Sequence, residues 1–197
     1  TIIMRYYDNN SDSWVINVSV QDTSGQIGRN DTLRFTYNSL AAFKITSRDV
    51  PESANLNFTE VFLNAQNQIA KAPILLNNTG NNDFDQINIT AADLFGLTTT
   101  TEFIGVGNFT VNITNSSSGL GLILTKLPQV IPGIDSTANA TLLHGPGISG
   151  ETLPYTGVAG FNTKGNQTLI FFVDVPSSGL SSQTYNNTWN LTVVDLS

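Results

Sequence analysis

The most frequent reactive grouping in the sequence is the N-glycosylation acceptor motif, an asparagine followed two residues later by serine or threonine. The asparagine side-chain amide receives the sugar in this motif. With 23 Asn, 24 Thr and 17 Ser in 197 residues, chance alone would produce roughly five such motifs. Thirteen are present, at Asn9, Asn17, Asn30, Asn57, Asn77, Asn88, Asn108, Asn112, Asn115, Asn139, Asn166, Asn186 and Asn190. The excess predicts passage through a glycosylating secretory route, with N-linked glycans as covalent modification and no other cofactor.

An alternative origin of the excess is the composition of β proteins, because Asn and Thr suit turns and solvent-facing strands. None of the thirteen motifs has Asp or Glu two residues before its asparagine, as the extended bacterial motif requires. The chain also has no cysteine, whereas secreted eukaryotic domains are often disulfide-bonded. We therefore expect an extracellular or cell-surface protein of archaeal origin. Thr1 in place of an initiator Met leads us to expect a processed chain.

Catalytic groupings are poorly represented. His144 is the only histidine and lies in a Gly- and Pro-rich loop, and no G-x-S-x-G motif occurs. The four glutamates are not spaced as a catalytic pair for glycoside hydrolysis. These observations disfavour a hydrolase, and we expect the protein not to be an enzyme.

Metal-ligating residues form one weak candidate site. Asp8, Asn10 and Asp12 match the start of a calcium-binding loop, but Ser13 and Ser19 stand where glycine and glutamate are expected. A plain turn is the favoured interpretation. Asn81, Asp83 and Asp85 form a second acidic turn with the same weakness. No metal site is therefore predicted.

Alternating apolar and polar residues indicate strands that position the acceptor motifs. The segments Trp14–Val20, Ile87–Thr90, Asn108–Thr114 and Thr188–Val193 follow this pattern. A strand places residues i and i+2 on the same face, so a whole motif faces solvent while its apolar neighbours face the core. We expect Asn17, Asn88, Asn108, Asn112 and Asn190 to mark outer faces.

The strand pattern predicts an all-β fold. Further strands are expected at Leu33–Tyr37, Phe43–Ser47, Leu56–Val61, Pro73–Leu76, Leu120–Leu124, Ala140–Leu143 and Thr168–Val175. The doubly apolar run Leu169–Val173 is typical of a central strand, and Trp14 and Trp189 are predicted in the core. Thr59–Lys71 also allows a short helix, although strand plus loop is preferred. About eleven to thirteen strands favour an antiparallel β-sandwich, jelly-roll-like or extended Ig-like, with an N-terminal arm.

Composition limits the partners. A formal charge of −7 and a pI near 4.4 argue against nucleic acid, whose binding depends on cationic contacts to phosphate. No apolar run reaches the ~18 residues of a membrane span. We expect neither nucleic-acid binding nor a membrane span in this chain.

The N-terminal region indicates assembly. We divide the chain into an arm or hairpin at residues 1–37 and a β-sandwich domain at 38–197. The segment Thr1, Ile2, Ile3, Met4, Arg5, Tyr6, Tyr7 is apolar on both faces and lacks an acceptor motif. Insertion into the sheet of a neighbouring subunit would bury it, and such a head-to-tail contact makes a homopolymer. A first strand within its own sandwich is an equally good interpretation.

Several stretches carry a family resemblance. Asp22–Gly25, Asn30–Leu40, Leu75–Asn81, Ala91–Leu94 and the closing segments Phe172–Pro176 and Trp189–Val193 are similar to archaeal cell-surface proteins built from β-sandwich domains. The closing pattern also resembles filament subunits of the TasA-like kind. That resemblance implies jelly rolls that polymerise by donating an N-terminal strand, and it implies no catalytic residue.

Two hypotheses follow. The first is a structural subunit of an extracellular glycosylated filament, pilus-like, or of a surface layer, joined by β-strand complementation. The alternative is an adhesin or carbohydrate-binding module of a larger cell-surface protein, which would need an exposed aromatic patch.

Overall fold

The fold is built from antiparallel strands. The computed structural model describes residues 11–47, 54–81, 86–112, 121–131 and 166–194. These residues form fourteen β-strands and one 3₁₀ turn, η1 (Val106–Asn108), without an α-helix. Every strand pair among them is antiparallel. The prediction of an all-β antiparallel protein is therefore confirmed.

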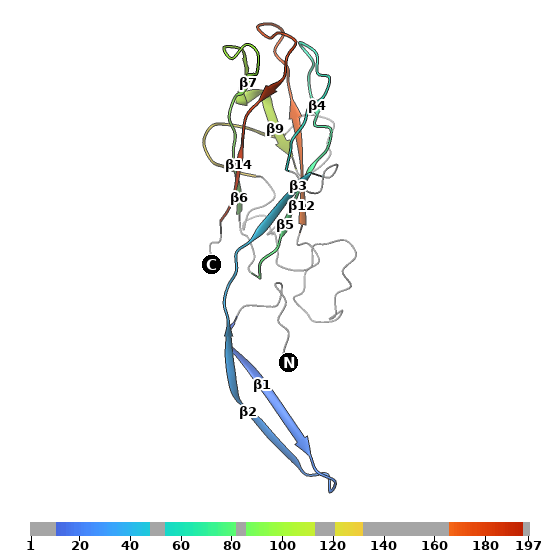
Figure 1. Cartoon of the computed structure of the whole chain (residues 1–197), viewed down its shortest axis with the longest axis vertical. Coiled ribbons are helices and arrows are strands. Elements are labelled where there is room, and N and C mark those ends of the chain that lie inside the picture. Colours follow the sequence, from blue (N-terminus) through green and yellow to red (C-terminus); the bar gives the residue numbers. More distant parts are fainter. Residues whose placement is uncertain (1–10, 48–53, 82–85, 113–120, 132–165, 195–197) are drawn as a thin grey trace.

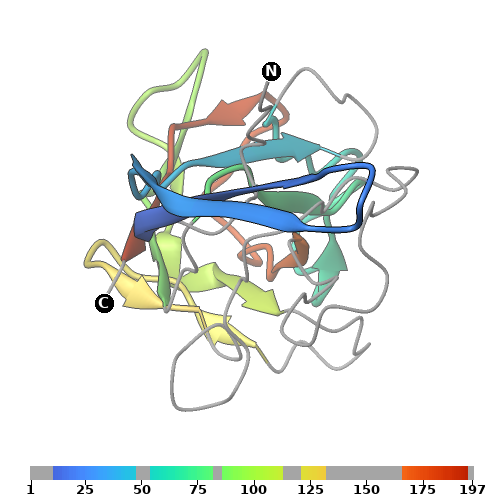
Figure 2. The same cartoon turned by 90° about the horizontal axis from the view of Figure 1, so that it is seen from below.

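The first two strands form a long hairpin by themselves. β1 (Ser11–Gln21) pairs with β2 (Ile27–Tyr37), and neither pairs with another strand of the described residues. The hairpin projects from one end of the remaining strands, which we call the body (Figure 1). Seen from below, it crosses in front of the body (Figure 2).

The largest sheet of the body has six strands. The order is β10 (Leu122–Ile123), β9 (Phe109–Asn112), β12 (Asn166–Val173), β5 (Ile74–Asn78) and β3 (Phe43–Ser47), and β4 (Gln68–Ile69) also pairs with β12. β12 thus lies in the middle of the sheet. Its residues Leu169, Phe171 and Phe172 are buried, as the apolar run at 169–173 predicts.

Two smaller sheets complete the body. One has the order β11 (Gln129–Val130), β6 (Gln86–Thr90), β14 (Asn190–Val194), and the other has the order β13 (Tyr185–Asn186), β7 (Leu94–Gly96), β8 (Phe103–Ile104). In β6, Ile87 and Ile89 are fully buried while Asn88 between them is half-buried. This is the alternation that the sequence predicts.

One hydrophobic core joins the six-stranded sheet to β6 and β14. Leu76, Val111 and Leu169 from the large sheet pack in one cluster with Ile87 and Ile89, and Leu191 and Val193 of β14 pack against it. Trp189 also packs against this cluster. Its ring meets Phe109 edge-on with centroids 5.1 Å apart, and its indole N–H donates to the Ala92 carbonyl at 2.8 Å. The predicted core position of Trp189 is confirmed.

The core position predicted for Trp14 is wrong. Trp14 lies on the hairpin and stacks on Phe35, with centroids 6.2 Å apart, and it is not among the residues of the core cluster. Val18 and Val20, which the pattern assigned to a core face, are exposed. An amphipathic strand has the same alternation whether its apolar face meets a core or lies on a projecting hairpin, so the pattern could not separate the two cases.

The segment between β3 and β5 also differs from the prediction. Leu56–Val61 forms no strand, although Leu56 and Phe58 pack against the core. The alternative helix over Thr59–Lys71 is absent as well, and the segment has only the short strand β4. The apolar residues are spaced in this way because they anchor an irregular loop to the hydrophobic core.

Candidate functional site

An apolar stripe runs along one face of the hairpin. Trp14 faces Phe35 and Ile16 faces Leu33 across the two strands, and opposed residues share a face. Between Ile16 and Val18 the register shifts, because β2 contributes one more residue than β1 to the intervening stretch. β1 alternates without interruption, so Val18 and Val20 continue the stripe toward the tip.

The stripe is open to solvent near the tip. Val18, Val20 and Leu33 are 46%, 67% and 55% exposed, and Val15 and Ile27 on the other face are exposed too. A two-stranded hairpin is at best marginally stable alone, and contiguous exposed apolar surface marks an interaction site. The hairpin therefore has the character of a contact element.

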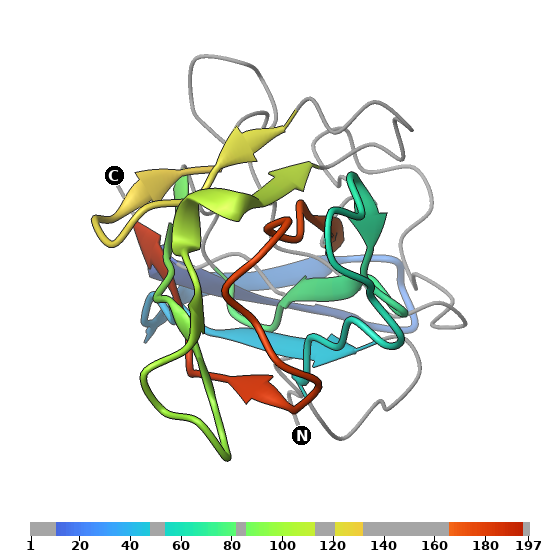
Figure 3. The same cartoon turned by 90° about the horizontal axis from the view of Figure 1, so that it is seen from above.

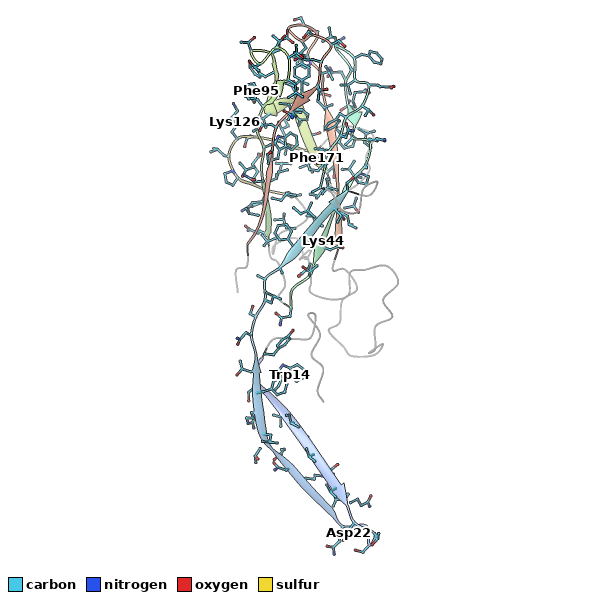
Figure 4. The ribbon with its side chains drawn as sticks, in the orientation of Figure 1. Trp14, Asp22, Lys44, Phe95, Lys126 and Phe171 are labelled. Carbon is cyan, nitrogen blue, oxygen red and sulfur yellow. The ribbon has the colours of Figure 1, made fainter. Side chains whose placement is uncertain are left out.

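The tip of the hairpin is held by one carboxylate. Asp22 Oδ1 accepts hydrogen bonds from the Ser24 N–H (2.9 Å), the Ser24 hydroxyl (2.8 Å) and the Gln26 N–H (2.8 Å). The hydrogen bond from the Ser24 hydroxyl is the main cause that lowers the pKa of Asp22 below its ordinary value. Gly25 adopts φ +86°, which favours glycine. The turn is thus preformed, and Asp22 marks the far end of the hairpin in Figure 4.

The base of the hairpin is bonded to the body. Asn81 is buried, its Oδ1 accepts the Leu40 N–H at 2.6 Å, and its Nδ2 donates to the Asn38 carbonyl at 3.0 Å. A Cβ on Gly80 would lie 2.0 Å from the Leu40 carbonyl oxygen, so only glycine permits this approach. The predicted acidic turn at Asn81 is in part a structural clamp, while its Asp83 and Asp85 lie outside the described residues.

The opposite end of the body, which we call the apical end, contains a cavity of about 710 Å³. Its lining includes Phe58, Val61, Leu94, Ile104, Val175 and Leu180. Figure 1 places β7 at this end, far from the hairpin along the longest axis, and Figure 3 looks down onto it. Glu60 is the charged residue among the described lining residues.

Several apolar side chains are exposed at the apical end. Phe62 and Leu63, which line the cavity, are 76% and 51% exposed. Phe95 and Phe103, on the face of β7 and β8 opposite to Leu94 and Ile104, form an exposed ring pair with centroids 5.9 Å apart. Figure 4 shows Phe95 near the apical end. Sequence reasoning missed these residues, since the segments that carry them show no extended alternation.

The loop that carries Phe62 has an unusual backbone. Glu60, Asn64 and Asn67 have φ values of 57°, 62° and 52°, in the left-handed region that non-glycine residues rarely adopt. Tertiary hydrogen bonds fix the loop, from the Asn64 N–H to the Pro176 carbonyl and from the Asn67 N–H to Asp174 Oδ1. The body therefore holds Phe62 and Leu63 outward at an energetic cost.

A hydrogen-bonded group, which we call the Glu102 cluster, fixes the other wall of the cavity. Glu102 Oε2 accepts hydrogen bonds from the Ser181 N–H and hydroxyl (both 2.7 Å), Gln183 Nε2 (2.8 Å) and the Tyr185 hydroxyl (2.8 Å). These bonds, from Ser181 first, lower the pKa of Glu102 from 4.5 to about 2. A carboxylate with so many donors is a poor general base, so the cluster has a structural character.

The acceptor motifs fall into three groups. Asn17, Asn30, Asn57, Asn186 and Asn190 are exposed, and Asn77, Asn88, Asn108 and Asn112 are half-buried. Asn9, Asn115 and Asn139 lie outside the described residues, and Asn166 lies in β12 without a described side chain. Asn30 Oδ1 accepts the N–H (3.0 Å) and hydroxyl (2.8 Å) of Thr32 within its own motif.

Two motifs face each other on neighbouring strands. Asn88 of β6 lies opposite Thr192 of β14, and Asn190 lies opposite Thr90. Each asparagine therefore faces the threonine of the other motif, and the two asparagines are diagonal neighbours roughly 7–8 Å apart. The Oδ1 atoms of Asn88 and of Asn77 are buried and accept no hydrogen bond in the described part of the chain.

Several predicted residues lie outside the described ranges. They are Thr1–Tyr7, the calcium candidates Asp8 and Asn10, and His144; Asp12 lies in β1. Among the residues with described positions, no group of three or more metal-ligating side chains occurs, and no helix is long and apolar enough to cross a membrane.

Comparison of the chain with protein-family models and with curated proteins finds no match. The site must therefore be interpreted from its own geometry, which consists of a projecting hairpin with an apolar stripe at one end and a cavity lined by apolar and polar residues at the other.

Proposed function

We propose that this chain is a structural, non-catalytic subunit of an extracellular N-glycosylated filament or surface layer, and that it forms a homopolymer head-to-tail through its N-terminal region. The observation that carries the proposal is the hairpin of β1 and β2. It pairs with no other described strand and exposes Val18, Val20 and Leu33. Neither of its edges pairs with another strand of the described residues, and addition of a strand to a sheet edge is the basis of β-strand complementation.

The arm as a whole supplies the contact in this proposal. Thr1–Tyr7 precede β1 in the chain, so a strand donated by these residues and the hairpin belong to one N-terminal unit, 1–37. The body, 38–197, is proposed to be a β-sandwich of jelly-roll-like or extended Ig-like kind. Its support is the single core that the six-stranded sheet shares with β6 and β14.

The extracellular and archaeal assignment rests on the thirteen acceptor motifs, on the missing acidic residue two positions before each of them, and on the absence of cysteine. It is supported by the exposure of five of the described motif asparagines.

Electron microscopy of the purified chain tests the proposal. We expect regular filaments or sheets whose repeat buries the hairpin of a neighbour. Deletion of residues 1–10 leaves β1 and β2 intact and separates donation by the first residues from contacts of the hairpin. A monodisperse monomer at high concentration would contradict the proposal, and normal polymers of the truncated chain would remove Thr1–Tyr7 from the contact.

A second function, an adhesin or carbohydrate-binding module, is favoured by the exposed rings of Phe62, Phe95 and Phe103, because exposed aromatic faces stack on sugars. Saturable binding of an oligosaccharide that Phe95→Ala and Phe103→Ala abolish, by a chain that stays monomeric, would support this function over assembly.

A further inference from the structure

Each end of the molecule exposes apolar side chains that a neighbouring copy could cover. At one end, the hairpin exposes Val18, Val20 and Leu33, and no other described strand covers it. At the other end, a cavity of about 710 Å³ is edged by Phe62, which is 76% exposed on a backbone held in a left-handed conformation at Glu60. Each of these features is unfavourable in an isolated subunit. Because they lie at opposite ends of the long axis (Figure 1), one copy can satisfy both features only through other copies.

The tip of the hairpin has apolar side chains on both faces. Val20 belongs to the stripe with Trp14 and Ile16, whereas Ile27 lies opposite Gln21 and therefore on the other face. The cavity lining contains the partly exposed apolar side chains of Phe58, Leu94 and Leu180 together with polar residues such as Ser182 and Thr184. Val20 and Ile27 can meet the apolar side chains, and the polar turn between them can meet the polar ones.

The tip is also preorganised. The three hydrogen bonds to Asp22 Oδ1 and the bond from the Asp22 N–H to the Gln26 carbonyl at 2.9 Å hold the turn before any contact is made. The Glu102 cluster similarly fixes Ser181, Gln183 and Tyr185 in the wall of the cavity. Association therefore orders few additional groups, which favours affinity.

The acceptor motifs set the depth of insertion. No motif lies between Asn17 and Asn30, and Asn30 pairs with Val18, so the two asparagines stand at the same height on the hairpin. The rise per residue of a strand puts Val18 about 13 Å from Asp22 along the hairpin. Glycans at Asn17 and Asn30 would form a collar below this bare tip. At the cavity, Asn57 is exposed and belongs to the lining, so insertion of the tip requires that this motif carry no glycan.

We propose that the hairpin tip, Val18–Arg29, of one copy inserts into the apical cavity of the next copy, with Val20 and Ile27 against the apolar part of its lining. The charges allow this pairing, because the tip carries Arg29 and the cavity lining carries Glu60. The contact joins two different surfaces, so repetition generates a filament. This inference rests on the proposed head-to-tail assembly and names the acceptor surface for it.

A complementation experiment tests the pairing. The variant Phe62→Asp/Leu63→Asp damages the acceptor, and Val20→Asp/Ile27→Asp damages the tip. All four side chains are exposed, so neither variant disturbs the core. Alone, each variant should raise the critical concentration for assembly at least about thirtyfold. Mixed in equal amounts, the two variants should form a discrete heterodimer, because one intact tip still meets one intact cavity.

A matched control places the same charge at a site outside the contact. Leu127→Asp alters an apolar residue that is 72% exposed and does not line the cavity. Leu127→Asp should assemble like the unaltered chain.

Cross-linking gives a second measurement, since the chain has no cysteine. Val20→Cys combined with Leu63→Cys, treated with a short bismaleimide under assembling conditions, should give a ladder of dimers, trimers and higher oligomers. Val20→Cys with Leu127→Cys should not.

The outcomes separate this inference from the proposed function. If the unaltered chain polymerises and Phe62→Asp/Leu63→Asp polymerises equally well, the acceptor lies elsewhere and this inference alone fails. If the unaltered chain stays monomeric, both fail. A monomer that binds a small apolar molecule or an oligosaccharide in the cavity would likewise overturn the pairing.

Discussion

The carboxamide of Asn81 accepts a 2.6 Å hydrogen bond from the backbone N–H of Leu40, a residue 41 positions earlier in the chain. This bond lies where the hairpin joins the body. Together with the bond from Asn81 Nδ2 to the Asn38 carbonyl, it fixes the direction in which the hairpin leaves. A subunit that polymerises along one axis needs such a fixed direction, because a hairpin with free rotation at its base would lose orientational entropy in every contact.

Asn81→Ala should loosen this junction. It leaves the Leu40 N–H and the Asn38 carbonyl without their side-chain partner, which costs roughly 1–3 kcal/mol for each group that stays buried. The Leu40 amide should exchange faster with solvent. The range of radii of gyration that fits the solution scattering should widen. Asn81→Asp keeps the acceptor oxygen for Leu40 but loses the donor to Asn38 and buries a charge, so it should also destabilise the junction. Unchanged exchange at Leu40 in Asn81→Ala would refute the clamp.

Gly80→Ala addresses the same junction sterically. The added Cβ would lie 2.0 Å from the Leu40 carbonyl oxygen and 2.8 Å from the Ala42 nitrogen, both of them backbone atoms. The two segments must therefore separate, and we expect a lower melting temperature and impaired assembly. Gly107→Ala, where no heavy atom lies within 4 Å of the new Cβ, is the control and should melt close to the unaltered chain.

The Glu102 cluster predicts an acid-sensitive apical end. Because folding lowers the pKa of Glu102 from 4.5 to about 2, the ionised carboxylate stabilises the folded state above pH 4.5. This stabilisation is lost progressively as the pH falls from 4.5 toward 2. The protection factors of amides 180–185, which compare measured exchange with the unstructured rate at the same pH, should therefore fall in that window, and assembly should weaken with it.

Glu102→Gln should remove most of this pH dependence, since it has no carboxylate to titrate. The protection factors at 180–185 should then be lower at neutral pH and nearly level between pH 5 and 2, a range that brackets the folded and ordinary pKa values of Glu102. Glu60→Gln removes a charge from the same end without touching these hydrogen bonds, and it should keep the dependence. The same pH profile in Glu102→Gln and the unaltered chain would contradict this assignment.

The strand pattern predicted much of the fold because it reports local burial. Phe43–Ser47 is a strand as predicted, and the alternation in β6 and β14 places Ile87, Ile89, Leu191 and Val193 toward the core. The central position of β12 followed from a run that is apolar on both faces. These features depend on neighbours in the sequence, which a single chain displays directly.

The apical end could not be predicted in the same way. Phe62 lies in a loop with left-handed residues, and the short strands β7 and β8 have three and two residues, too few to show a period. Glu102 meets Ser181 and Tyr185 across about eighty positions of chain. A sequence without aligned relatives carries no signal for such contacts, and the position of Trp14 was wrong for a related reason, since packing partners decide where an apolar face lies.

Asp22 should control the tip. Asp22→Ala removes the acceptor for three hydrogen bonds, from the N–H and hydroxyl of Ser24 and from the Gln26 N–H. The Gln26 amide should then exchange severalfold faster, because it loses its hydrogen-bond acceptor. Asp22→Asn keeps an Oδ1 acceptor and should preserve most of the protection. Equal loss of protection in both variants would show that another interaction holds the turn.

The paired motifs on β6 and β14 predict how lateral contacts are limited. β14 is an edge strand of its sheet in the described residues, and an open edge pairs readily with other chains unless it is blocked. A glycan on Asn190 would stand on that edge strand, and one on Asn88 would stand beside it, diagonal across the register.

Thr90→Ala/Thr192→Ala abolishes both motifs but retains both asparagines, and it should make filaments bundle side by side while head-to-tail assembly continues. Thr90→Ser/Thr192→Ser retains both motifs and should leave single filaments, so side-chain loss and glycan loss are separated. Mass spectrometry must show that the first pair lacks sugar at these two positions and the second pair has it. If the alanine pair stays unbundled despite that loss, β14 is protected by protein rather than by carbohydrate.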